Sequence, residues 1–301
     1  MNTEGFKKIR GNTYYLPQKT NIGVIEINDQ VILIDSGNDK DAGRKIRQIL
    51  DEEQMSIKYI LNTHSNADHI GANAYLMNQY HCSSYGLKRE VAFSHYPELE
   101  SSLLYGGYPS EAMRNKFLMS KPCEMLDLQT NKIEIDYFEI KGHWLDMVAY
   151  KTKDNVYFIG DSLFPADIIN KYHLFYIYSI KDYLQTLELL LKINEQDDVI
   201  FVPSHGVLSK DISEVVELNK RKIMEVIALI KQMCGVKITF DDLFKQIFDY
   251  YQLTLDLNQY LLIGSTIRNY LTYLLDKNEI AFIFEDNKLY YLTKEQELLK
   301  E

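Results

Sequence analysis

Two histidines and an aspartate lie close together in the stretch NTHSNADHIGAN, residues 62–73. His64, Asp68 and His69 follow the apolar run IKYIL, which predicts a buried strand that ends where this motif begins. A short loop can aim two imidazoles and a carboxylate at one point, and divalent metals of the zinc type prefer such ligands. Taken alone, the triplet fits a metal site and an ordinary polar loop equally well.

Three further stretches each place a candidate ligand directly after a hydrophobic strand. His143 lies in IKGHWLDMVAY, Asp161 in VYFIGDSLF and His205 in FVPSHG. Loops at strand ends commonly carry the chemistry of a domain. We therefore expect these three side chains and the triplet to converge on one small volume and to share metal ions.

Strands and helices alternate through residue 206, which favours an α/β sandwich over separate all-α and all-β parts. The apolar runs NIGVIEI at 21–27 and VILIDSG at 31–37 predict a hairpin that ends in the loop of Asp35, Ser36 and Gly37. Apolar periodicity predicts helices over 41–54, 72–80 and 181–196, and strands over 57–64, 132–143, 147–152, 155–162 and 198–206.

Residues 84–125 break this alternation, because they are rich in Tyr, Gly and Pro and lack a long clean period. Two readings are equally consistent with the sequence. The segment is either a lid or wall beside the site, or an ordinary helical insertion packed on the sandwich.

A second unit is expected over residues 211–301, after a first domain at 1–210. It contains predicted helices at 211–235, 239–251 and 259–278 and a hairpin at 280–293, an order that resembles a winged helix. Acidic side chains outnumber basic ones over 236–301, so the unit lacks the positive face that DNA binding needs. We expect it to pack on the first domain or to form a homodimer.

The whole chain has 301 residues and a formal net charge of −10, which disfavours nucleic acid and anionic membranes as partners. No signal-peptide core and no apolar run long enough to span a membrane is present, so a cytoplasmic protein is expected. Cys82, Cys123 and Cys234 are far apart and lack CxxC spacing, which predicts free thiols.

The set of candidate ligands, in the order His-x-Asn-x-Asp-His, Gly-His, Gly-Asp and His-Gly, resembles the metallo-β-lactamase fold superfamily. The resemblance covers residues 12–206 and includes the stretches NTYYLP and LIDSGN. It implies an αββα sandwich with two metal sites. By position, His64 and His143 would serve the first metal, and Asp68, His69 and His205 the second. Asp161 would bridge both, and Asp35 would orient a ligand or loop.

This chain departs from the family pattern at two positions. Asn66 stands where the family usually has a histidine, and a neutral amide oxygen is a weaker ligand than imidazole. Asn66 could still bind metal weakly or contact the bridging water, so we expect the first site to bind metal less tightly than the second. Trp144 follows His143 where many relatives carry a small residue, and it could line the substrate pocket or belong to the core.

Three histidines remain outside the set. His81 and His95 are expected to be surface or core residues. His173, in DIINKYHLFYIY, follows the loop of Asp161 and could contact substrate.

The resemblance implies a metal-dependent hydrolase of a small ester, lactone, thioester or amide, with Asp68 or Asp161 accepting a proton. The expected cofactor is Zn²⁺, as one or two ions, with Fe or Mn as alternatives. Ser36 and Ser162 lack the GxSxG pattern of a serine nucleophile. The alternatives are a degenerate metal-binding or interaction protein without turnover and a di-iron redox protein.

Overall fold

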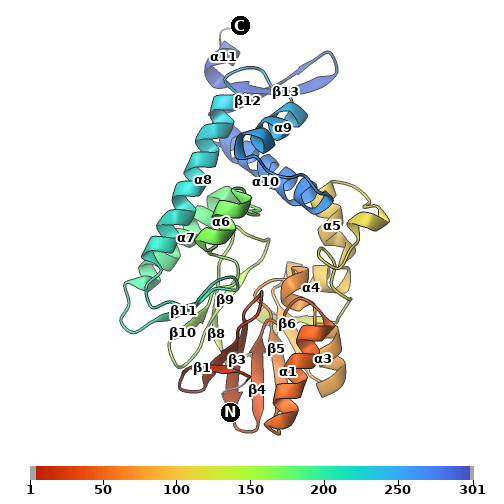
Figure 1. The fold of residues 1–301 in the computed structure, drawn as a ribbon, viewed down its shortest axis with the longest axis vertical. Coiled ribbons are helices and arrows are strands. Elements are labelled where there is room, and N and C mark those ends of the chain that lie inside the picture. The colour runs from red at the N-terminus through yellow and green to blue at the C-terminus, as the bar shows by residue number, and fades with distance from the viewer. Residues whose placement is uncertain (1–4, 299–301) are drawn as a thin grey trace.

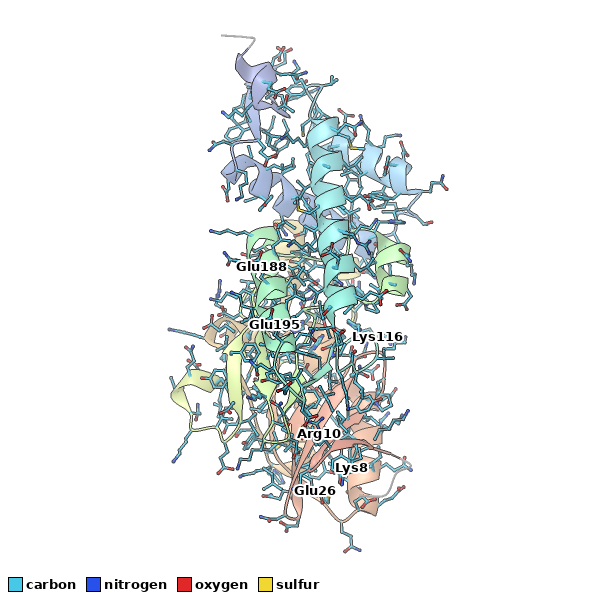
Figure 2. The ribbon with its side chains drawn as sticks, turned by 90° about the vertical axis from the view of Figure 1, so that its left-hand side faces the viewer. Lys8, Arg10, Glu26, Lys116, Glu188 and Glu195 are labelled. Atoms are coloured by element: carbon cyan, nitrogen blue, oxygen red, sulfur yellow. The ribbon has the colours of Figure 1, made fainter. Side chains whose placement is uncertain are left out.

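Two β-sheets pack face to face, and helices cover their outer faces (Figure 1). The structure is a computed structural model and describes residues 5–298. This arrangement is the αββα sandwich that the sequence predicted. The molecule is elongated, with the sandwich at one end and a C-terminal hairpin at the other (Figures 1 and 2).

The first sheet has seven strands in sequential order: β1 (Lys7–Arg10), β2 (Thr13–Leu16), β3 (Ile22–Ile27), β4 (Gln30–Ile34), β5 (Ser56–Leu61), β6 (Ser83–Gly86) and β7 (Met125–Asp127). β1 to β4 pair antiparallel, and β4 to β7 pair parallel. Three helices follow its parallel strands: α1 (Lys40–Glu52), the short α2 (Ala67–Ile70) and α3 (Asn73–Tyr80).

The second sheet has four strands in the order β11 (Ile200–Val202), β10 (Val156–Phe158), β9 (Val148–Lys151) and β8 (Asp136–Glu139). Its outer face is covered by helices that include α7 (Ile180–Asn194), while α6 (Ala166–Tyr172) follows the loop of Asp161. Glu188 of α7 and Glu195, the residue that follows its last turn, are exposed, so these charges lie in solvent (Figure 2).

The alternating direction of side chains along β4 explains how the first sheet is buried on both faces. Ile32 and Ile34 of β4 face the second sheet and pack in the core between the sheets, whereas Val31 and Leu33 pack against α1 and α3. Successive side chains of a strand point to opposite faces, so a strand covered on both sides reads as one apolar run. VILI is such a run.

The segment 84–125 is helical. It contains α4 (Lys88–His95), α5 (Glu98–Tyr105) and the 3-10 turn η1 (Glu111–Met113), and a second 3-10 turn, η2 (Leu128–Thr130), follows β7. α4 packs beside β6 and β7, and α5 reaches the C-terminal helices. The segment is therefore a packed helical insertion, which also forms one wall of the site described below.

The C-terminal region shares its core with the sandwich. Its elements are α8 (Ser213–Met233), α9 (Phe240–Tyr251), α10 (Leu257–Asp276), β12 (Ile280–Glu285), β13 (Lys288–Thr293) and α11 (Lys294–Leu298). Side chains from the outer face of the second sheet, from α7 and from α8 to β12 form one continuous buried cluster. α10 crosses from the hairpin towards α5 (Figure 1), and the two helices pack together.

Two further features of the described residues bear on the sequence predictions. Cys82, Cys123 and Cys234 are free thiols, as expected. Within residues 5–298, each helix is too short or too polar to cross a lipid bilayer.

Candidate metal centre

Six side chains meet at one edge of the sandwich, each just past the end of a strand. His64, Asp68 and His69 come from the loop after β5 and from α2, and His143, Asp161 and His205 follow β8, β10 and β11. They form two groups in which the donor atoms lie within 4.8 Å of one another: His64, His143 and Asp161 in one, and Asp68, His69 and His205 in the other. The structure thus brings together the residues that the sequence pattern selected.

Asp161 belongs to the first group and also contacts the second. Its Oδ1 is 3.3 Å from His69 Nε2, and its Oδ2 is 3.3 Å from His205 Nε2 and 3.6 Å from His143 Nε2. Asp68 Oδ2 is 3.5 Å from His205 Nε2 and 3.6 Å from His69 Nε2. Ligands about 2.1 Å from a tetrahedral ion lie about 3.4 Å apart, so these separations suit donors that share an ion.

All four imidazoles are held by Nδ1, which leaves Nε2 for the centre. His143 Nδ1 donates to the Tyr176 carbonyl at 2.9 Å, and His205 Nδ1 donates to the Lys19 carbonyl at 2.9 Å. A carbonyl accepts only, so the proton must be on Nδ1 in both rings. Such partners fix the tautomer and the direction of a metal-binding histidine.

Asp35 fixes the other two imidazoles, one directly and one through Thr63. Its Oδ2 accepts from His69 Nδ1 and from Thr63 Oγ1, both at 2.8 Å, and its Oδ1 accepts from the Thr63 amide. Because the hydroxyl proton of Thr63 is directed at Asp35, His64 Nδ1 donates to Thr63 Oγ1 at 3.0 Å. The orienting role implied for Asp35 therefore has a geometric basis.

Backbone geometry places His143 as well. Gly142 has φ +121°, a value that L side chains rarely adopt, and a Cβ there would lie 2.2 Å from the Tyr183 backbone nitrogen. The chain turns sharply after β8 for this reason. The observed strand is shorter than the predicted 132–143, because the chain bends at residues 134–135 before it and at residues 142–144 after it.

The donor set fits a metal. His64 Nε2 is buried without a hydrogen-bond partner among the described residues, and His69 Nε2 and Asp161 Oδ1, 3.3 Å apart, are buried and form no well-aligned hydrogen bond there. Buried polar atoms are nearly always satisfied, so atoms left without a partner need an explanation. Imidazole nitrogens and carboxylate oxygens that converge in this way are the donor chemistry of zinc and of related transition metals.

In the absence of metal, the four histidines fall into two pairs whose pKa values are shifted in opposite directions. Burial lowers the pKa of His64 well below its ordinary value and lowers that of His143. Burial also opposes the charged form of His205, but Asp161 and Asp68 outweigh it and raise the pKa to about 9. In the same way, Asp68 and Asp161 raise the pKa of His69 well above its usual range. Protons on His69 and His205 thus supply the positive charge that metal ions would replace.

The comparisons with known proteins identify the family. A family profile described as the metallo-beta-lactamase superfamily matches residues 16–205, which include all six donors. The chain belongs to this superfamily. A search among curated proteins finds no match to the sequence.

Solved structures of this superfamily share the fold. A beta-lactamase domain protein from Burkholderia ambifaria has 16% sequence identity and a TM-score of 0.72, with 96% of this chain and 93% of that chain covered. A metallo-beta-lactamase family protein from Thermus thermophilus has 16% identity and a TM-score of 0.71, with 94% and 99% covered. The DIM-1 metallo-beta-lactamase has 14% identity and a TM-score of 0.51, with 73% and 97% covered. At these identities the likeness concerns the fold alone.

Asn66, the departure from the superfamily pattern, faces a residue that the sequence reading did not single out. Its Nδ2 donates to Oε1 of Glu100 on α5 at 2.9 Å. Glu100 is only 7% exposed, and burial, with the nearby charge of Asp68, raises its pKa well above the ordinary value. The helical insertion therefore reaches into the metal centre.

The two proposed substrate contacts lie in different places. Trp144 lines the cavity beside the donors, is 1% exposed and has an Nε1 with no hydrogen-bond partner among the described residues. The ring of His173 instead stacks on Tyr251 of α9 at 4.5 Å. His173 is not among the described residues that line the cavity, although its neighbours Tyr172 and Leu174 are.

A cavity of about 500 Å³ opens beside Asp68, His143, Asp161 and His205. Its apolar lining comes from three separate segments: Leu104, Phe117 and Leu118 of the insertion; Phe164, Ile168, Leu174 and Phe175 after β10; and Leu262 and Ile263 of α10. The exposed Lys19 and Lys171 also contribute to the lining. The C-terminal region thus forms part of the site, which its sequence did not reveal.

Proposed function

We propose that this protein is a metal-dependent hydrolase that acts on a small ester, lactone, thioester or amide with an apolar portion. The observation that carries the proposal is the common orientation of the four imidazoles. Each is held through Nδ1 by a protein oxygen, and each directs Nε2 towards Asp161 or Asp68. A side chain held in this way needs no rearrangement to bind a metal ion.

The six residues divide naturally between two ions. His64 and His143 would hold the first, Asp68, His69 and His205 the second, and Asp161 both. Zn²⁺ is the proposed ion, and Fe and Mn suit the same donors. Such an ion, when bound, polarises a carbonyl oxygen and lowers the pKa of water towards neutrality.

The two carboxylates are suited to different tasks. The side chain of Asp161 is 6% exposed and lies among three imidazoles, which suits a bridging ligand. The side chain of Asp68 is 32% exposed and faces the cavity, and its Oδ2 accepts a hydrogen bond from Thr20 Oγ1 at 2.9 Å. Asp68 is therefore the better placed of the two to accept a proton from the attacking water and to pass it on.

Protein nucleophiles are poorly placed for this reaction. Ser36 Oγ donates to the His69 carbonyl, and Ser162 Oγ donates to the Ile159 carbonyl at 2.6 Å. Both residues are buried. Their environment supports attack by water over a covalent serine mechanism.

The cavity supports a substrate with an apolar portion. Apolar side chains line it together with the donors, and Trp144, whose Nε1 has no hydrogen-bond partner among the described residues, belongs to the same lining. A carbonyl placed at the donors would leave the rest of the substrate against α10 and the insertion. A few polar groups in an apolar cavity of this size are typical of small-molecule sites.

The test is hydrolysis by the full chain after metal removal and separate reloading with Zn²⁺, Fe²⁺ or Mn²⁺. The panel contains nitrophenyl esters of increasing acyl length, a lactone, a thioester and an amide. We expect metal-dependent turnover of at least one carbonyl class, lost in His143→Ala and retained in His95→Ala, a surface control. Bound metal without turnover of any substrate would favour the alternative, a metal-binding protein without catalysis.

A further inference from the structure

Glu100 is a buried carboxyl group inside the substrate cavity. It lies on α5, and it is 7% exposed. Its side chain forms no salt bridge within residues 5–298, and the side-chain hydrogen bond that the structure gives it there is with Asn66. Burying a carboxyl group without a cation costs free energy. The position of Glu100 beside the metal donors therefore indicates a functional role.

The side chain of Asn66 has an unusual hydrogen-bond partner for its position. It occupies the N-cap of α2, where an asparagine side chain commonly accepts a hydrogen bond from the backbone. Here the side chain makes no capping bond and instead donates Nδ2 to Glu100 at 2.9 Å. The amide thus contributes nothing to its own helix.

The direction of the Asn66 amide is given by its contact with Glu100. The structure places Nδ2 against Glu100 Oε1, and Oδ1 at the opposite end of the amide therefore makes no hydrogen bond to Glu100. Asn66 stands between His64 and Asp68 in the metal motif and lines the same cavity as His143 and Asp161. An amide oxygen is a neutral metal ligand, and Asn66 lies beside the donors of the first site in both sequence and space.

We propose that Glu100 is a positioning residue, which holds Asn66 so that its Oδ1 completes the first metal site. This inference rests on the proposed metal centre. In the usual superfamily pattern an imidazole occupies this position, whereas here a weak ligand is made usable by a second residue that fixes its orientation. Residues that orient ligands commonly change metal affinity by about 10–100-fold.

The contact extends further, because α5 packs against α10. Leu104 of α5 forms a buried cluster with Leu118 and with Leu261 of α10. A metal ion that fixes Asn66 and Glu100 would therefore stabilise α5 in its packed position, and this packing would in turn favour metal in the first site, since such coupling is reciprocal.

The experiment is a stepwise Zn²⁺ titration of the full chain against a chromophoric chelator, which reports the affinity of each site. Glu100→Met removes the acceptor, and Glu100→Gln keeps one. Glu98→Met, on the same helix, is the matched control. We expect Glu100→Met to weaken the first site by about tenfold or more, Glu100→Gln to weaken it less, and Glu98→Met to leave both sites unchanged.

The Asn66→Leu substitution tests whether Glu100 changes the affinity of the first site through Asn66. If Glu100 acts through Asn66, the double variant Asn66→Leu, Glu100→Met binds the first ion no more weakly than Asn66→Leu alone. An equal additional loss in the double variant would overturn the proposal, as would unchanged affinity in Glu100→Met. If the unaltered chain binds no Zn²⁺ at all, the proposed function fails as well.

Hydrogen exchange tests the same coupling in the unaltered chain, so it does not depend on whether a variant folds. Filling the first site in the unaltered chain should slow amide exchange over residues 98–105, compared with the chain that holds only its tighter ion. Unchanged exchange in that helix would contradict the coupling of Glu100 to the first site.

Discussion

His69 Nδ1 donates to Asp35 Oδ2 at 2.8 Å, and both side chains are almost completely buried. The same carboxylate accepts from the amide and the hydroxyl of Thr63, so all three of its partners are donors. The motif His64–His69 is thereby tied to the loop after β4, and the proton of His69 is fixed on Nδ1. Both oxygens of a carboxylate accept hydrogen bonds, whereas an amide has one oxygen and one NH2 group. In an Asp35→Asn variant the NH2 group would therefore face at least one of these three donors.

Asp35→Asn should therefore weaken metal binding without removing a ligand. The amide nitrogen would face the Thr63 backbone amide in one orientation, and His69 Nδ1 with the Thr63 hydroxyl in the other, so either the loop of Thr63 or the His69 imidazole would lose its fixed position. We expect the metal affinity to fall by about 10–100-fold, measured by chelator competition. Asp51→Asn, an exposed substitution on α1, serves as the control. Unchanged affinity in Asp35→Asn would mean that the carboxylate does not orient the centre.

Glu90→Gln should destabilise the fold despite its similar shape. Glu90 is fully buried, and its two oxygens accept from the amides of Ser65 and Asp146 at 2.8 and 3.0 Å. An amide nitrogen in place of either oxygen leaves a buried donor unsatisfied, at a cost of about 1–3 kcal/mol. Chemical denaturation should be measured at pH 8, above the value of about 7 to which burial raises the pKa of Glu90. A variant as stable as the unaltered chain would contradict this account.

The stability of the metal-free protein should fall as the pH rises from about 6.5 to about 9. The pKa of His205 is raised from 6.5 to about 9 in the fold, because Asp161 and Asp68 outweigh the effect of burial. Its proton therefore stabilises the fold fully below about pH 6.5, and that stabilisation is lost as the pH rises through the folded pKa.

Metal affinity should change in the opposite direction, since the same proton must leave before His205 can bind. Thermal unfolding of the metal-free and metal-loaded chain across this range tests both trends. Parallel pH profiles for the two forms would contradict the assignment of His205 as a ligand.

Leu262→Trp should obstruct the cavity without disturbing the metal centre. Leu262 of α10 lines the cavity on the wall formed by the C-terminal region. We expect the KM for substrates with a long acyl group to rise severalfold while metal affinity stays unchanged. Leu255→Trp is the matched control, because Leu255 is 54% exposed and does not line the cavity. Equal effects of the two substitutions would argue against substrate binding beside α10.

The sequence predicted the sandwich and its donors because both depend on local patterns. Runs such as VILI are apolar without a break, which indicates a strand buried on both faces, and each candidate ligand follows such a run. Strands that end at one edge of a sandwich bring their loops together. The positions of His64, His143, Asp161 and His205 could thus be related before their geometry was known.

Glu100 and the α10 wall of the cavity could not be found in the same way. In the helix ELESSLLY, Glu98 and Glu100 look alike, and only the tertiary position of α5 beside the metal motif buries the second. Such burial depends on contacts between segments far apart in the chain, which apolar periodicity does not encode. The apolar pattern of α10 likewise predicts only that Leu262 is one of several core residues. Whether it lines the cavity depends on where the helix crosses the sandwich.

The central claim is that these six side chains hold metal, and elemental analysis of the full chain tests it most directly. The chain should be loaded with Zn²⁺, freed of unbound metal and compared with Asp161→Asn and with His95→Ala. We expect about two ions per unaltered chain and per His95→Ala chain, and a clear loss in Asp161→Asn, because that carboxylate serves both sites. Equal metal content in all three, or only traces in the unaltered chain, would contradict the account.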